Sequence, residues 1–356
     1  MTQSEILSSP EAPRPAAQEE RAAAQSPGNI LRRMLQAREM GVFLALVVLV
    51  VAMTILSPSF FTELNIFNVL RGMSTIGIMS IGVTMVIVTG GIDLSVGSVL
   101  AAASIMTARL MYTEVMSPWL AFLTGLAFGG VLGLVNGLVI TRLKVPPFIA
   151  TLGMLTIARG LTYLLASGLQ GSVASNVPMR DETVAFLGNG YVLQNFSFLQ
   201  RGIPFPVILM IVLVVIFTLF LKHTVLGRQI YAVGSNEAAA RLSGVPADLV
   251  KLFVYAVTGV LAALSGIMTA GLLRTAATNA GSGVELDVIA AVVIGGASLA
   301  GGEGTIIGAI IGAAIMAVVR NAFVLLQFPS FGQQITIGIV IVAAVAADRW
   351  RRRNRA

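Results

Sequence analysis

The 356-residue chain has no cysteine, one histidine and few charged residues, and each shortage excludes a class of protein. Without cysteine there is no disulfide framework and no thiolate metal site. Only 11% of the residues are charged and 56% are hydrophobic, which is more apolar material than a soluble domain can bury. We therefore expect an integral membrane protein with no catalytic residue and no metal ligand of its own.

The chain also lacks the sequence signals of an energy source. The dipeptide Gly-Lys never occurs, so there is no phosphate-binding loop, and no compact soluble segment is long enough to hold ATP. No apolar run carries the paired acids or acid-histidine chains of a proton relay, and His223 falls at the end of a predicted helix. We expect no cofactor on this chain.

The net charge of +7 is not typical of a nucleic-acid-binding protein, because the basic residues gather at the ends and in short connections between apolar runs. Residues 1–39 are rich in Ala, Pro, Gln, Ser and Glu and predict a disordered cytoplasmic tail. Residues 350–356 form a basic C-terminus, which we also place in the cytoplasm. The transmembrane domain then covers residues 40–349.

Apolar runs of roughly 20 residues predict the membrane-spanning helices. Among the ten predicted spans, residues 285–299 are short for a crossing. If that segment were re-entrant the total would be nine and the Arg-rich C-terminus would lie outside; we prefer ten, which places it inside. The predicted spans are residues 40–56, 72–89, 94–111, 119–140, 148–166, 203–221, 252–273, 285–299, 305–326 and 335–347.

Residues 231–251 form the one long polar, helix-capable segment between strongly apolar runs. Gly234 and Ser235 are suited to the N-cap of a helix over residues 236–243, and Glu237 places an acid in its first turn. Gly244 is expected to end this helix, and Pro246 to open the next one. The basic residues on either side place the segment on the cytoplasmic face.

An apolar stripe of Ala238, Ala239 and Leu242 lies at helical spacing on this predicted helix. Such a stripe can dock on another protein. The alternative is an ordinary helix in a loop at the membrane surface.

Glycine-rich breaks interrupt the apolar runs at two places, residues 90–95 and residues 295–304. Their similar patterns suggest a weak internal repeat. In the first break Gly90 and Gly91 end one helix, and Asp93 or Ser95 can cap the next by accepting from its free N–H groups. Alternatively these four residues line a translocation path near a gate. Asn136, in the fourth span, is suited either to contact with a solute or to a hydrogen bond between helices.

Small residues recur every four positions on one face of the fourth span, at Gly125, Gly129, Gly133 and Gly137. Such a face lets helices approach closely, either within one subunit or between two subunits. Arg159 lies inside the fifth span, so it must face the bundle or reach the outer interface.

Four separated stretches closely resemble the permease subunits of ribose-type sugar ABC importers. They are GGIDLSVGS, VPPFIATLGMLTIARG, GSNEAAARLSGV and ELDVIAAVVIGGASLAGGEGT, in that order along nearly the whole chain from about residue 40. The resemblance implies a type II-like importer permease fold of about ten helices in the bacterial inner membrane. It also implies a second permease copy, identical or paralogous, a cytoplasmic ABC ATPase subunit that binds ATP and Mg, and a periplasmic sugar-binding protein.

The same resemblance gives residues 231–251 the role of the coupling segment, through which movements of the ATPase reach the membrane. Its spacing departs by one residue from the family pattern, so the helix and its glycine carry over more securely than a contact by Glu237. The coupling residues are expected to be Asn236, Glu237, Ala238, Ala239, Leu242 and Gly244. An ion-coupled secondary transporter is the alternative function, with a channel or scaffold third. These spans do not distinguish a pentose from a hexose or a polyol.

Overall fold

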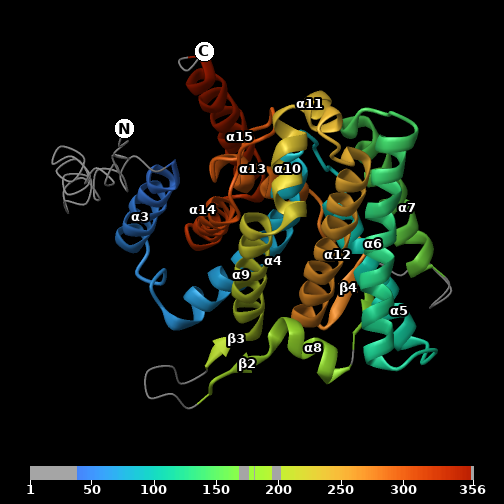
Figure 1. Cartoon of the computed structure of the whole chain (residues 1–356). Coiled ribbons are helices and arrows are strands. Elements are labelled where there is room, and N and C mark those ends of the chain that lie inside the picture. The colour runs from blue at the N-terminus through green and yellow to red at the C-terminus, as the bar shows by residue number, and fades with distance from the viewer. Residues whose placement is uncertain (1–37, 168–175, 180, 195–201, 354–356) are drawn as a thin grey trace, which may run out of the picture.

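The computed structural model describes residues 38–167, 176–179, 181–194 and 202–353. They form an all-α integral membrane protein with two short two-stranded sheets (Figure 1). Of the predicted tail of residues 1–39, residues 1–37 lie outside the described residues, while Arg38 and Glu39 already belong to the first helix. At the other end the last helix continues to Arg353, so the arginines that follow the final apolar run begin on a helix.

Each of the ten apolar segments expected from the sequence is helical. Among the described residues seven helices are long and apolar enough to cross a membrane, while α5 has 17 residues, α13 only 11, and the described apolar part of α15 is Phe331–Ala343. The ten helices are α3 (Arg38–Leu56), α4 (Glu63–Val88), α5 (Val96–Tyr112), α6 (Pro118–Arg142), α7 (Pro147–Ala166), α9 (Phe205–His223), α12 (Ala247–Leu273), α13 (Val284–Ile294), α14 (Ile306–Leu325) and α15 (Ser330–Arg353).

The remaining elements lie at the two ends of the bundle (Figure 1). One end carries the short helices α10 (Val225–Ser235) and α11 (Glu237–Leu242). The opposite end carries α8 (Glu182–Asn189) and four strands, which are β1 (Asn176–Pro178), β2 (Tyr191–Val192), β3 (Ile203–Pro204) and β4 (Thr275–Ala277). Strand β1 pairs antiparallel with β4, and β2 with β3.

The segment that contains α13 runs from one end of the bundle to the other. It leaves β4 at the α8 end, and the break after α13 contacts α10 at the opposite end. The short helix is therefore only part of a complete pass, and the rest is non-helical chain. This path is consistent with ten passes rather than nine.

The glycine face of α6 packs against α12 inside the subunit. A Cβ added at Gly133 would lie 2.2 Å from the backbone oxygen of Tyr255, and one at Gly129 would lie 2.6 Å from that of Gly259. Only glycine allows so close an approach of the two helix backbones. The structure thus supports packing within one subunit over a seam between subunits.

Two charged side chains in the bundle are paired with backbone or with one another. The guanidinium of Arg159 donates to the carbonyl oxygens of Thr278 and Ala280, at 2.7 and 2.9 Å. Asp287, in the first turn of α13, is fully buried and bonded to Arg320 of α14. These contacts keep charged groups from facing lipid unpaired, which would be costly.

Candidate coupling site

The polar segment folds as two short helices rather than one. Helix α10 follows α9 almost directly, and its Thr224 N-cap accepts a hydrogen bond from the Gly227 amide at 3.0 Å. Ile230 and Val233 bury the inner face of α10. Sequence reasoning missed this helix, although Thr224 and the spacing of Leu226, Ile230 and Val233 signal it.

Helix α11 forms where the sequence predicts it, within one residue at each end. Its N-cap is Asn236, whose side-chain oxygen accepts from the Ala239 amide at 3.0 Å. The prediction that Gly234 and Ser235 supply this cap was wrong, because both belong to the last turn of α10. Gly244 follows α11 with a positive φ of 82°, and α12 begins after Pro246, both as predicted.

The predicted docking stripe on α11 is at the surface. Ala238, Ala239 and Leu242 are exposed, and Leu242 is 90% exposed. Ala240, on the opposite side, is buried against the neighbouring helices. The stripe is therefore free to contact another molecule.

Glu237 is bound within the subunit. Its carboxylate accepts from Arg241 at 2.8 Å and from Lys251 of α12 at 2.6 Å, and Arg241 is also bonded to Asp248 of α12. Partial burial raises the pKa of Glu237, but the hydrogen bonds from Lys251 and Arg241 lower it more, so this pKa lies below its ordinary value. Glu237 thus fastens α11 to α12 and is not a free contact residue.

The first glycine-rich break joins α4 to α5 deep within the protein. Gly90 has a φ of 79°, and the chain from Gly91 to Ser95 is non-helical before α5 begins. Asp93 and Ser95 are buried, at 2% and 1% exposure. Non-helical chain at this depth requires polar partners within the protein.

A chain of hydrogen bonds supplies these partners. The Asp93 carboxylate accepts from the amide of Ser95 at 2.8 Å and from its hydroxyl at 2.6 Å. The Ser95 hydroxyl in turn accepts from the side-chain amide of Asn136 at 2.9 Å. Ser95 is the N-cap residue of α5, but its side chain makes no capping hydrogen bond. Asn136 therefore contacts the break and not an open cavity, and it anchors this break to α6.

The second glycine-rich break lies next to the first in space. The Gly302 amide donates to the carbonyl oxygen of Val88, the last residue of α4, at 2.9 Å. Gly302 has a φ of 75°, a conformation that favours glycine. The second break is thus bonded through backbone to the end of α4, directly before the first break and more than 200 residues away in sequence.

Helix α10 packs directly on the contact between the breaks. A Cβ added at Gly234 would lie 1.6 Å from the Val88 carbonyl oxygen and 2.7 Å from the Gly302 nitrogen. In addition, the Tyr231 hydroxyl donates to the carbonyl oxygen of Gly304 at 2.8 Å. We call Val88, Gly234 and Gly302 the backbone joint. It connects the helix that precedes α11 with both interruptions of the bundle.

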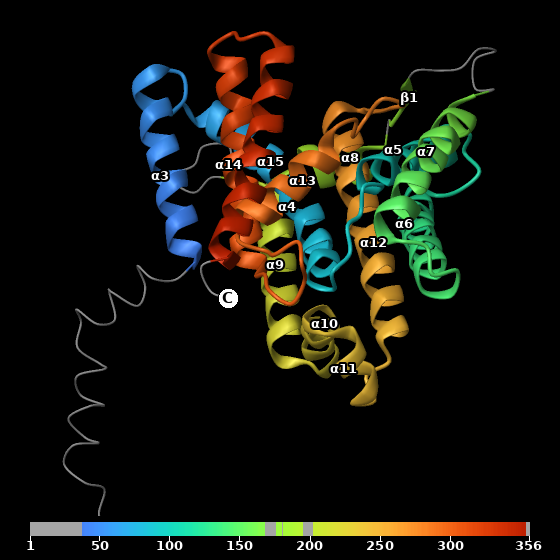
Figure 2. The same ribbon diagram turned by 90° about the horizontal axis from the view of Figure 1, so that it is seen from above.

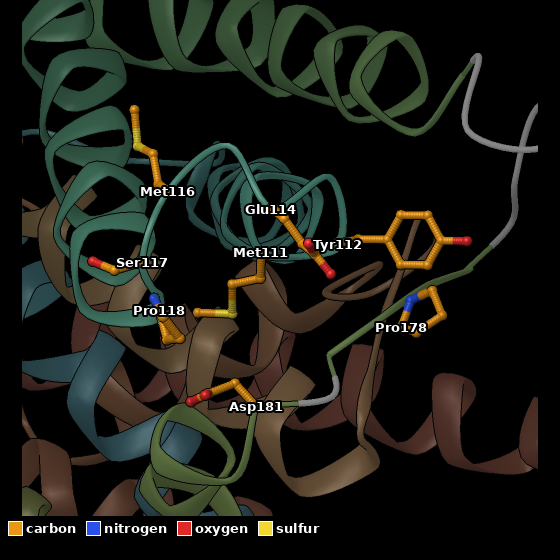
Figure 3. A pocket seen from close by; sticks show the side chains of 8 residues that line it. All are labelled: Met111, Tyr112, Glu114, Met116, Ser117, Pro118, Pro178 and Asp181. Atoms are coloured by element: carbon orange, nitrogen blue, oxygen red, sulfur yellow. The ribbon is translucent and has the colours of Figure 1, made fainter.

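A small cavity lies at the opposite end of the protein, between the α5–α6 connection and the start of α8 (Figure 3). Its volume is about 410 Å³, and Tyr112, Glu114 and Asp181 contribute polar groups to its lining. The Asp181 side chain also caps α8 by accepting from the Val184 amide at 2.9 Å. None of the predicted gate residues lines this cavity.

Comparison with known proteins places this arrangement in a family. Residues 65–345 match the family model described as the permease component of branched-chain amino acid transport systems. The chain is 43% identical over 315 residues to the ribose import permease RbsC of Bacillus subtilis (strain 168), covering 88% of this chain and 93% of the relative. The chain belongs to the ribose-type permeases of ABC importers. It is the membrane subunit of a sugar importer.

Two further relatives are consistent with this assignment. The Escherichia coli (strain K12) RbsC is 42% identical over 305 residues, which is 86% of this chain and 92% of the relative. The L-arabinose ABC transporter permease AraH of Azospirillum brasilense is 34% identical over 315 residues, 88% of each chain. No solved structure matches the permease. The matches give no support to an ion-coupled transporter.

The family also fixes the coarse setting of the permease. Importers of this type combine a membrane permease with an ATPase and a periplasmic binding protein. The permease is accordingly a transport component and a multi-pass protein of the inner membrane.

Proposed function

We propose that this permease carries ribose or a closely related pentose, delivered by the periplasmic binding protein. The names of its relatives, ribose permeases at 42–43% identity and an L-arabinose permease at 34%, support this substrate class. ATP and Mg bind the ATPase subunit, and this chain holds no cofactor. Two permeases, identical or paralogous, form the transporter.

The proposed orientation places α10, α11 and both termini in the cytoplasm. Glu39 at the start of α3 is bonded to Thr305, and Lys222 and Arg228 lie close by around the start of α10. Arg142 ends α6 and Lys144 follows it, and α15 ends in arginines at the same side as α11 (Figure 1). Basic residues gathered at one end favour that end as cytoplasmic.

The exposed stripe on α11 is the proposed contact with the ATPase. The observation that carries this proposal is that Leu242 is 90% exposed on α11. Helix α11 is bonded to α12 through Glu237, and it follows α10, which contributes Gly234 to the backbone joint. Leu242 forms one exposed apolar stripe with Ala238 and Ala239, and a contiguous exposed apolar patch favours a protein partner. Asn236 and Gly244 shape α11, and Glu237 holds it in place.

Movement of the ATPase would then reach the translocation path through the backbone joint. Because close-packed backbone contacts transmit displacement with little compression, a shift of α10 moves the chain at Gly90, Gly91 and Gly302. Asp93, Ser95 and Asn136 hold the first break in its closed, buried arrangement. We propose that this break forms the cytoplasmic gate.

The test is sugar uptake and ATPase binding by Leu242→Asp and Ala239→Glu variants of the complete transporter. Loss of a well-packed contact residue at a protein interface costs about 2 kcal/mol, so the affinity for the ATPase should fall roughly tenfold or more. Val225→Asp is the matched control, because Val225 is 61% exposed at the same end but lies on α10. Val225→Asp should leave uptake and co-purification unchanged.

Normal uptake and normal ATPase co-purification in both α11 variants would refute the coupling assignment. Uptake by the permease alone in liposomes, driven by an ion gradient without the ATPase, would refute the importer mechanism. Uptake of hexoses in preference to pentoses would refute only the proposed substrate.

A further inference from the structure

A second cavity lies near the start of α10, and its lining contains neither the exposed residues of α11 nor the backbone joint. Its volume is about 700 Å³, within the range of roughly 300–1,000 Å³ that small-molecule sites occupy. Helices α3, α9, α10 and α14 each contribute lining residues. Helix α14 packs against both α3 and α9, and both views show it between them (Figures 1 and 2).

The walls and the rim of this cavity differ in chemistry. Leu221, Ile306 and Ile307 give it apolar walls. At the rim stand two cations, Lys222 at the end of α9 and Arg228 on α10. The cavity thus combines an apolar interior with a positively charged entrance.

Both cations are free to bind an anion. Among the described residues neither Lys222 nor Arg228 forms an ion pair with a carboxylate, and the guanidinium of Arg228 donates to the His223 carbonyl oxygen at 3.5 Å. The one acid in the lining is Glu39, which accepts a hydrogen bond from Thr305 at 3.1 Å. The rim therefore keeps a net positive charge.

The surroundings of the cavity are those of lipid-facing helices. Leu219 on α9 and Ile307 on α14 are each 52% exposed, and α3 exposes apolar side chains along its length. An acyl chain can lie along such surfaces while a headgroup phosphate reaches the rim. Basic pockets between helices on the cytoplasmic side of a membrane favour anionic lipid headgroups.

We propose that this cavity binds an anionic phospholipid, with its phosphate between Lys222 and Arg228 and the upper part of its acyl chains against Leu221, Ile306 and Ile307. A free phosphate ion has the same charge chemistry, but it would leave the apolar walls uncovered. The apolar walls therefore favour the lipid over the free ion.

The experiment is native mass spectrometry of the full-length permease titrated with phosphatidylglycerol and, separately, with phosphatidylcholine. Each basic residue near a membrane surface contributes about fivefold to the binding of an anionic lipid, so Lys222→Ala/Arg228→Ala should weaken phosphatidylglycerol binding roughly 25-fold. Lys222→Arg/Arg228→Lys keeps both charges and should bind nearly as wild type. Arg142→Ala, an exposed arginine at the same end outside the cavity, is the matched control and should also bind as wild type.

Two outcomes would overturn the proposal. The first is equal binding of phosphatidylglycerol by wild type and the double alanine variant, or no preference over phosphatidylcholine. The second is displacement of phosphatidylglycerol by equimolar inorganic phosphate, which would identify the site as one for the free ion. Lys222→Arg/Arg228→Lys changes the same two positions but keeps both positive charges. Its binding therefore shows whether the double alanine variant loses affinity because the charges are gone or because the protein is misfolded.

Discussion

Replacing Gly234 by alanine tests the backbone joint most sharply. The added Cβ would lie 1.6 Å from the Val88 carbonyl oxygen, whereas such contacts are essentially never shorter than 3.0 Å. Helix α10 must therefore retreat from α4 by about 1.4 Å, or the end of α4 must move. Since Val88 also accepts from the Gly302 amide, either movement disturbs both breaks.

The size of the effect follows from the atoms that collide. Overpacking a close-packed site costs about 1–3 kcal/mol when side chains can adjust, and here the obstacle is backbone. Alanine otherwise favours a helix by about 1 kcal/mol over glycine, so propensity acts in the opposite direction. We expect a net loss of roughly 2 kcal/mol in the free energy of unfolding, together with a large loss of uptake.

The assay is sugar uptake and ATP hydrolysis in liposomes that contain the complete transporter, with thermal unfolding of the permease measured in parallel. Gly153→Ala in α7 is the control, because an added Cβ there meets no atom within 4 Å. That control should transport as wild type. Wild-type uptake with an unchanged Tm in Gly234→Ala would refute the joint as the link between α10 and the breaks.

Two further variants test the contacts around the coupling segment. Glu237→Gln should loosen α11 from α12 by about 0.5–1 kcal/mol, seen as faster amide exchange in α11. The pKa of Glu237 is lowered from 4.5, so wild type should keep this protection above pH 4.5 and lose it as the pH falls through the lower folded-state pKa. The variant should show no such step in protection with pH. A step of equal size in both proteins would contradict the ion pairs. Asn136→Ala should cost about 1–3 kcal/mol in the free energy of unfolding, because it removes the donor to the buried Ser95 hydroxyl. An unchanged Tm relative to wild type would show that Asn136 does not hold the first break.

Hydropathy and local capping signals were enough to predict much of this fold. Lipid imposes long apolar helices, so all ten predicted segments are helices, and the glycine and proline after α11 mark its end as expected. The regular glycines of α6 predict close packing, which α12 provides. The errors are local: α10 was missed because it is amphipathic and lies between an apolar run and a polar one.

The backbone joint could not be predicted from the sequence. Val88, Gly234 and Gly302 come from three distant segments, and their contact involves backbone atoms, which carry no residue-specific signal. Likewise, the sequence predicts Glu237 as a contact residue for a partner, whereas in the structure it is bonded to Lys251 of the next helix. Such pairings depend on how the helices cross, and single-sequence patterns do not contain that information.

The most direct test of the central claim uses Leu242→Cys, the one thiol in a chain without cysteine. Because Leu242 is 90% exposed on α11, a membrane-impermeant maleimide should label the variant in inside-out vesicles and not in intact spheroplasts. Bound ATPase should protect it. Labelling from the outer side, or equal labelling with and without the ATPase, would contradict α11 as the cytoplasmic coupling helix.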